Sequence, residues 1–142
     1  MENTRTVLNR TQKTEKLHWH IEHWRSDLQF MEDETRFLEQ LLHSDVFEPD
    51  TPHLSDRIQK YSARLDKFKA RKSRLRDLIA KHERFLGSVM ASQDEEVVSD
   101  FYFRHDDLEM EVLDCTDDFK SLKKELFDFM AEALRKPRTE MA

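Results

Sequence analysis

Hydrophobic residues recur at alternating steps of three and four along three long stretches of this chain. In the first stretch the recurring positions are Leu17, Ile21, Trp24, Leu28, Met31, Thr35, Leu38 and Leu42. In the second they are Leu54, Ile58, Tyr61, Leu65, Phe68, Lys72, Leu75, Ile79, His82 and Leu86. In the third they are Phe101, His105, Leu108, Val112, Cys115, Phe119, Leu122, Leu126, Phe129 and Ala133. A repeat of about 3.5 residues predicts amphipathic helices that supercoil around one another.

Residues that favour turns and helix ends separate the three stretches. The segment "SDVFEPDTP" holds two of the three prolines, and Thr51 followed by Pro52 is a predicted helix start. Gly87 stands where a helix would end in a left-handed residue. The segment Ser92 to Glu95 has the pattern of a capping box that opens the third helix, and Pro137 is expected to close it.

These signals predict an all-α protein with a single domain over residues 1–142. The helices are expected at about residues 12–44, 52–87 and 93–136, with residues 1–10 and 138–142 flexible. Because the connections are short, consecutive helices should run antiparallel. The predicted fold is therefore three long helices in an antiparallel coiled-coil-like bundle.

Composition supports long helices and a packed core. The 142 residues include one Gly and three Pro, and 38% of them are charged. Ten Phe and two Trp on a regular repeat argue against disorder. The single cysteine, Cys115, excludes an intramolecular disulfide. With no apolar leader at the N-terminus and no apolar stretch of membrane length, the sequence predicts a soluble cytoplasmic protein without a membrane partner.

Charge divides by helix. Residues 54–93 hold eleven Lys and Arg against four Asp and Glu, residues 14–45 hold three against eight, and residues 94–134 hold four against fourteen. A basic helix between two acidic ones is complementary within one chain, and like-charge repulsion disfavours wrong pairings. The basic run "RLDKFKARKSRLR", residues 64–76, could face nucleic acid. Pairing with the two acidic helices is the favoured interpretation, so no nucleic-acid partner is expected.

The stretch "LHWHIEHW" raises the question of a metal site, because histidine is a common metal ligand. Matching residues across the turns places His82 near position 14 of the first helix and His105 near Leu17. Glu15, His18 or His20, His82 and His105 could then converge at one end of the bundle. Two or three imidazoles with one carboxylate would suit Zn, and open coordination could suit Fe.

The residue pattern weakens this metal hypothesis. A ferritin-like dimetal site needs carboxylates that project into the core from several helices, and no position of the three repeats listed above carries Asp or Glu. His82 and His105 are better explained as hydrogen-bonded core histidines. A metal-binding bundle that uses Glu15, His18, His20, His82 and His105 stays the alternative, and no cofactor is the preferred prediction.

No catalytic group stands out in the sequence. Cys115 occupies a core position of the third repeat, where it behaves as a small hydrophobic residue. The acidic run "RHDDLEMEVLDCTDD" is most simply a face that meets solvent and the basic helix. A chain with one glycine has no glycine-rich phosphate loop. We therefore expect a protein that is not an enzyme.

The first helix carries a second set of apolar residues outside its core repeat. Trp19, His23, Phe30, Phe37 and Leu41 cluster about 130° from the core direction at about 100° per residue. We call these five residues the outer stripe. Either the loop "VFEP" and residues 1–12 cover them, or they form an interface with another protein chain.

The end of the third helix is also apolar on nearly every side. Phe127, Met130 and Leu134 lie off the repeat, and Val46 and Phe47 of the preceding loop could cover them. Phe103, Met110 and Leu113 lie off the repeat as well and could join a contact with a second chain. The preferred function is protein binding through the outer stripe. The stripe would bind either a second copy of the chain, which forms a homodimer, or a partner helix.

Overall fold

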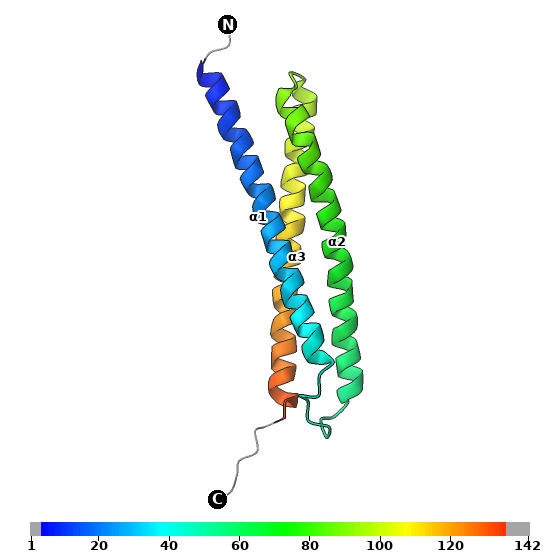
Figure 1. Ribbon diagram of the computed structural model, residues 1–142. Coiled ribbons are helices and arrows are strands. Elements are labelled where there is room, and N and C mark those ends of the chain that lie inside the picture. The colour runs from blue at the N-terminus through cyan, green and yellow to red at the C-terminus, as the bar shows by residue number, and fades with distance from the viewer. Residues whose placement is uncertain (1–3, 136–142) are drawn as a thin grey trace, which may run out of the picture.

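The computed structural model describes the backbone of residues 4–135 and the side chains of residues 12–135. It contains three long helices, α1 (Thr4–Leu42), α2 (Leu54–Ala91) and α3 (Glu95–Ala133). They lie side by side in one elongated bundle in which each helix runs antiparallel to the next (Figure 1). The all-α fold predicted from the hydrophobic repeat is confirmed.

The core consists of the predicted repeat positions. Every repeat residue of α1 and α3 is buried, and Ile21, Leu28, Leu65, Ile79 and Leu122 are fully enclosed. On α2 the repeat residues nearest its start are only half-buried; these are Leu54, Ile58, Tyr61 and Phe68. Burial of apolar area at about 25 cal/mol per Å² is the main force that holds the three helices together.

The structure corrects the limits of α1. This helix begins at Thr4 rather than near residue 12, and it ends at Leu42 rather than at residue 44. The first twelve residues contain neither Gly nor Pro, so nothing in them stops the helix from extending toward the N-terminus. Residues 138–142 and Pro137 lie outside the described residues.

The start of α2 differs from its prediction. The residue before the helix is His53, not Thr51, and its side chain makes no capping hydrogen bond. His53 has φ 57° and ψ 31°, a left-handed conformation that is uncommon for a residue other than Gly. Thr51 instead donates its backbone N–H to the carbonyl of Glu48, within the turn that precedes the helix.

The turn between α2 and α3 also corrects the prediction. Gly87 does not end α2, because the helix continues to Ala91 and Gly87 has no positive φ. Asp94, not Ser92, caps α3: its carboxylate accepts a hydrogen bond of 3.0 Å from the backbone N–H of Glu96. The Ser92 hydroxyl accepts from the N–H of Asp94, so it supports the cap from one step away.

The loop between α1 and α2 closes the opposite end of the bundle. Phe47 is buried, and its ring stacks on Phe129 of α3 at 5.5 Å between centroids. The backbone of this loop also bonds to the end of α3, through Glu48 N–H to the Ala133 carbonyl at 2.7 Å. Of the three residues of α3 that this loop could cover, Met130 is buried, whereas Phe127 and Leu134 stay 47% and 37% exposed.

Ion pairs join α2 to both acidic helices. Toward α3 they are Arg57–Glu132, Arg64–Glu125, Arg71–Asp118 and Arg74–Glu111. Toward α1 they are Arg25–Glu83, Lys69–Glu39, Lys72–Glu32 and Arg76–Glu32. Six of the seven basic side chains in residues 64–76 take part, which confirms the predicted internal pairing. Each exposed pair contributes at most about 1 kcal/mol, so their main effect is to select the register.

In the part of the chain that the structure describes, no helix has both the length and the apolar character needed to cross a membrane.

Candidate functional site

The outer stripe of α1 is exposed. Trp19, Phe30 and Phe37 are 64%, 65% and 58% exposed, respectively. Steps of eleven and seven residues bring these three rings to the same side of the helix, at about 100° per residue. The VFEP loop, one possible cover, packs against the end of α3 instead. Residues 1–12 are the other possible cover, and the side chains of residues 1–11 lie outside the description.

The other two stripe residues occupy less prominent positions. His23 is exposed and stacks on Trp19 with ring centroids 5.1 Å apart and nearly parallel planes. Its Nε2 lies 3.5 Å from a carboxylate oxygen of Asp27. Leu41 is half-buried and packs against the core. The exposed part of the stripe is therefore the three aromatic residues together with His23.

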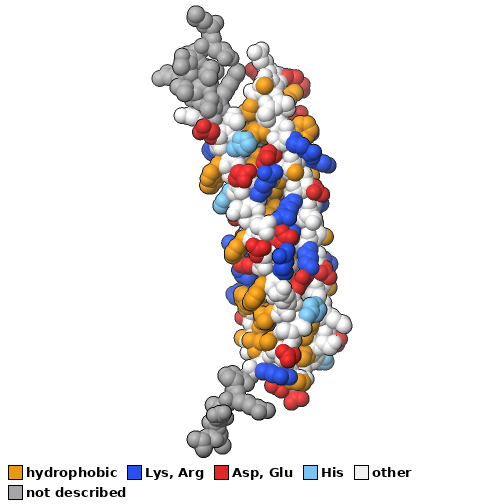
Figure 2. All heavy atoms as spheres, in the orientation of Figure 1, with side chains coloured by type: hydrophobic (Ala, Val, Ile, Leu, Met, Phe, Trp, Pro, Cys, Tyr) orange, Lys and Arg blue, Asp and Glu red, His pale blue; other side chains and the backbone are white. Residues whose placement is uncertain are grey.

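Two residues of α3 extend this apolar surface. Lys123 of α3 pairs with Glu34 of α1 at 2.9 Å, which fixes where the two helices face one another. Phe127 lies one turn beyond Lys123, and it is 47% exposed. Leu113, 51% exposed, lies on the same side of α3, because steps of three and four connect it to Phe127. Figure 2 shows hydrophobic side chains gathered along this edge of the bundle.

Carboxylates border the stripe. Glu22, Asp27, Asp33 and Glu34 each lie one turn before or after a stripe residue, so they are its neighbours on the helix surface. Glu22 and Asp33 are exposed, and Asp27 and Glu34 are half-buried. Lys16, which is exposed one turn before Trp19, and Lys123, which pairs with Glu34, are the cations at this border, so the border is predominantly acidic but not wholly so.

A chain of three histidines crosses the upper half of the bundle. Nδ1 of His20 on α1 lies 2.9 Å from Nε2 of His105 on α3. Nδ1 of His105 lies 2.8 Å from Nε2 of His82 on α2. His105 and His82 are buried, and His20 is half-buried. Both ring nitrogens of His105 are therefore satisfied, each by a histidine from a different helix.

Aromatic rings enclose this chain and keep water from it. The ring of His82 stacks on Phe101 at 4.2 Å, and the ring of His105 lies 4.6 Å from that of Trp24. Burial, with smaller contributions from the neighbouring His82 and His20, lowers the pKa of His105 to about 4. Burial also lowers the pKa of His82, with a smaller contribution from Arg104. Both imidazoles are consequently neutral at pH 7.

The metal-site hypothesis is not supported by this geometry. His20 and His82 contact opposite nitrogens of His105, so the three rings do not converge on one point. Glu15 and His18 are exposed and take no part in the chain. Among the side chains of residues 12–135, no group of three or more His, Cys, Asp or Glu residues is placed to hold a metal ion.

The expected register between α1 and α2 is also wrong. It placed position 14 beside His82, whereas the ring beside His82 is that of Trp24, 6.2 Å away. The difference is more than two turns, at about 3.6 residues each. Matching residues across this turn requires Leu42 and Leu54 to be level, and they are not, because the loop that joins them folds under the bundle and inserts Phe47 into the core.

Cys115 is a core residue, as predicted. It is fully buried, and its Sγ lies 3.9 Å from the sulfur of Met31. Burial raises the pKa of the Cys115 thiol, so the reactive thiolate form is disfavoured.

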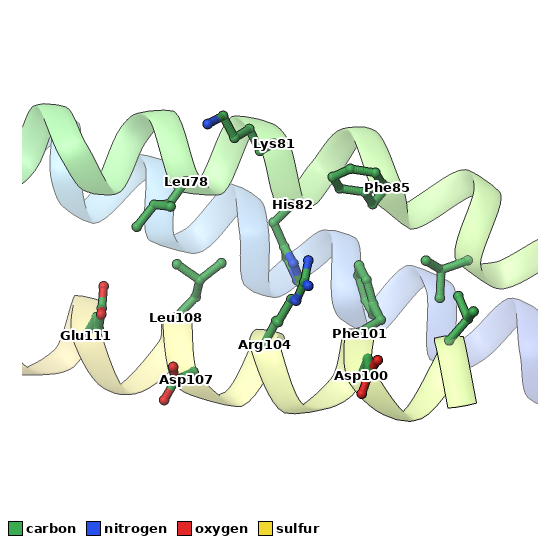
Figure 3. A pocket seen from close by; sticks show the side chains of 12 residues that line it. Leu78, Lys81, His82, Phe85, Asp100, Phe101, Arg104, Asp107, Leu108 and Glu111 are labelled. Carbon is green, nitrogen blue, oxygen red and sulfur yellow. The ribbon is translucent and has the colours of Figure 1, made fainter. Parts of the chain in front are cut away.

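A groove lies between α2 and α3, with a cavity volume of about 470 Å³. Figure 3 shows it from close by, with α1 passing behind. Its apolar lining comes from both helices and consists of Leu78, Phe85, Val89, Val97, Phe101 and Leu108. Lys81 lies on the α2 side, and Asp100, Arg104, Asp107 and Glu111 lie on the α3 side. Sequence reasoning missed this groove, although Phe85 and Val97 both lie outside the core repeats.

These features define the class of the protein as an antiparallel three-helix bundle with two exposed apolar surfaces. No protein-family model matches the chain, and neither a curated protein nor a solved structure is similar enough to match it.

Proposed function

We propose that this protein is a non-enzymatic helical bundle that binds a partner helix through the outer stripe of α1. The observation that carries the proposal is the exposure of Trp19, Phe30 and Phe37, at 58–65% each, on one side of one helix. An aromatic side chain buries about 150–250 Å² in a contact, and aromatic residues dominate interface energetics. Three such rings in line match the spacing at which an amphipathic helix presents its anchors.

The charged border specifies the chemistry of the partner. Glu22 and Asp33 are exposed beside the stripe, and Asp27 and Glu34 lie at its inner edge. A partner helix with an apolar face and lysine or arginine on both flanks would complement this border. A second copy of the outer stripe would bring two sets of carboxylates together, so the stripe fits a basic partner better than it fits itself.

The test uses two designed helical peptides of about three heptads. Both carry leucine on one face; one has lysine at the flanking positions and the other has glutamate. We expect isothermal titration calorimetry to show that the protein binds the lysine-flanked peptide. It should bind the glutamate-flanked peptide weakly or not at all. The double variant Phe30→Glu, Phe37→Glu should lose binding of the lysine-flanked peptide by at least about tenfold, because it places charges where the apolar anchors dock.

A matched variant on another surface distinguishes specific binding at the outer stripe from non-specific binding to exposed phenylalanines. Phe85→Glu with Phe103→Glu also replaces two exposed phenylalanines, at 54% and 73% exposure, but on α2 and α3. This control should bind the lysine-flanked peptide as the wild type does. Equal losses in both double variants, or equal binding of the two peptides by the wild type, would overturn the proposal.

A further inference from the structure

We infer that the face formed by α2 and α3 docks on the same face of a second copy of this chain, as a symmetric four-helix contact. This goes beyond the proposed function, because it uses the side of the bundle that holds the α2–α3 groove and not the outer stripe.

The groove supplies an apolar part of such a contact. Phe85 and Val97 line it and are 54% and 41% exposed, so these side chains lack a full set of packing partners in one copy. Phe103 and Met110 of α3 are 73% and 59% exposed. They do not line the groove, but each lies one turn from Asp107, which does, so a second copy seated on the groove could reach them.

The two helices that form this face carry opposite charges. On α2, steps of three and four connect a nearly continuous basic row: Arg57, Lys60, Arg64, Lys67, Arg71, Arg74 and Lys81. On α3 the corresponding row is acidic: Asp100, Asp107, Glu111, Asp114, Asp118, Glu125, Asp128 and Glu132. Arg104 interrupts the acidic row, but Asp100 and Asp107 lie on either side of it, so the α3 side of the groove stays negative.

Part of each row remains unpaired within one copy. The arginines of α2 pair with carboxylates of α3 at the inner edge of the face. Lys60 and Lys81, in contrast, are exposed and make no ion pair with a described residue, and the same holds for Asp107 and Asp128. In Figure 3 the side chain of Lys81 points away from α3, although Asp107 lies across the same groove.

Charge selects one symmetric arrangement. A two-fold axis parallel to the helices places α2 of one copy over α3 of the other, so basic rows oppose acidic rows twice. A two-fold axis across the helices would place α2 over α2 and α3 over α3, so like charges would oppose. Like-charge contacts across an interface cost several kcal/mol, which excludes the second arrangement.

The levels of the unpaired residues fit the first arrangement. Lys81 and Asp107 flank the contact between His82 and His105, so they lie at one height along the bundle. Lys60 and Asp128 lie at one height as well, between the Arg57–Glu132 and Arg64–Glu125 pairs. A parallel two-fold axis keeps each height unchanged. Lys81 therefore meets Asp107 of the second copy, and Lys60 meets Asp128 of the second copy.

Exposed apolar side chains supply part of the area that a stable contact buries. Aromatic side chains bury about 150–250 Å² each, and a standard interface buries about 800 Å² per partner. Phe85, Val97, Phe103 and Met110 supply an apolar patch at the end of this face nearest the α2–α3 turn. The charged rows extend from this patch along the rest of the face, toward the α1–α2 loop.

The test is an exchange of charges between two variants of the full chain. One variant carries Lys60→Glu and Lys81→Glu, and the other carries Asp107→Lys and Asp128→Lys. We expect light scattering to give twice the 17.2 kDa chain mass for the wild type and about the single chain mass for each variant alone. An equimolar mixture of the two variants should regain the double mass, because each exchanged residue of one variant then faces a residue of opposite charge in the other.

The mixture distinguishes a true interface from damage to the fold. Circular dichroism should show wild-type helicity for both variants, since all four positions are exposed. If one of them loses helicity, the single exchanges Lys81→Glu and Asp107→Lys carry the same test. A monomeric wild type at about 100 μM, variants that remain dimeric, or folded variants that do not associate when mixed would each overturn the inference. The stripe variant Phe30→Glu, Phe37→Glu should keep the double mass. A failure of this inference can therefore be distinguished from a failure of the proposed function.

Discussion

At the scale of single residues, the most consequential feature is the buried chain of His20, His105 and His82. The sequence suggested, as part of the alternative metal site, that His18 or His20 could meet His82 and His105 at one end of the bundle, and it predicted that His82 and His105 are core residues. It did not predict that both nitrogens of His105 would bond to other histidines at 2.8–2.9 Å. That arrangement depends on how side chains from three different helices are oriented toward one another. The hydrophobic repeat of a single helix gives no information about this orientation.

The buried histidines make the free energy of unfolding of the protein depend on pH. The pKa of His105 falls from the ordinary 6.5 to about 4 in the folded protein, so the unfolded chain takes up its proton first as the pH falls. The free energy of unfolding should therefore decrease as the pH drops from about 6.5 toward 4. The loss is on the order of 3 kcal/mol for His105, at about 1.4 kcal/mol per pKa unit, and the lowered pKa of His82 adds to it.

Urea unfolding followed by circular dichroism between pH 7 and pH 4 measures this dependence. The double variant His82→Leu, His105→Leu should flatten it above about pH 5, because the two histidines with lowered pKa are gone. Ion-paired glutamates, whose pKa values are also lowered from 4.5, affect stability only near and below that pH. His18 and His43 are exposed, so His18→Leu with His43→Leu is the matched control and should leave the slope unchanged. A wild type whose stability is flat over this range would contradict the prediction.

At the scale of elements, the helices were predicted well in their middles and poorly at their ends. The interiors follow from the apolar repeat, which persists over many turns. The ends depend on local competition between a few residues, and Gly87 is the clearest case. It has the residue type of a helix end, but Val89 beyond it is buried in the core, and that burial extends α2 to Ala91.

Replacement of Gly87 by alanine tests where α2 ends. A Cβ atom at this position would meet nothing within 4 Å, and Ala is favoured over Gly in a helix interior by about 0.5–1 kcal/mol. We expect Gly87→Ala to raise the free energy of unfolding by that amount in chemical denaturation. A destabilised variant would mean that Gly87 has a left-handed conformation and ends the helix there.

At the scale of the whole molecule, all three helices share one core, so they should unfold together. Leu65 is fully buried in the middle of α2. A carboxylate there has no partner and costs several kcal/mol, against a typical total stability of about 5–15 kcal/mol. We expect Leu65→Asp to remove most of the far-ultraviolet helical signal, including that of α1 and α3. Ala63→Asp, at an exposed position of the same helix, should leave the signal intact; partial loss in Leu65→Asp would indicate helices that fold separately.

The sequence by itself determined which side of each helix is buried, because a repeat of three and four residues describes the environment of one helix face. It also determined that α2 pairs with both neighbours, because the charges of the three helices are complementary. The tertiary structure alone decided the register of α1 against α2. Sliding one long helix past another by a turn or two preserves most apolar burial, and the loop that carries Phe47 selects among these positions. The tertiary structure also decided that the three aromatic residues of the outer stripe are exposed, that the histidines form a chain, and that a groove opens between α2 and α3, because exposure and contact depend on where neighbouring helices lie.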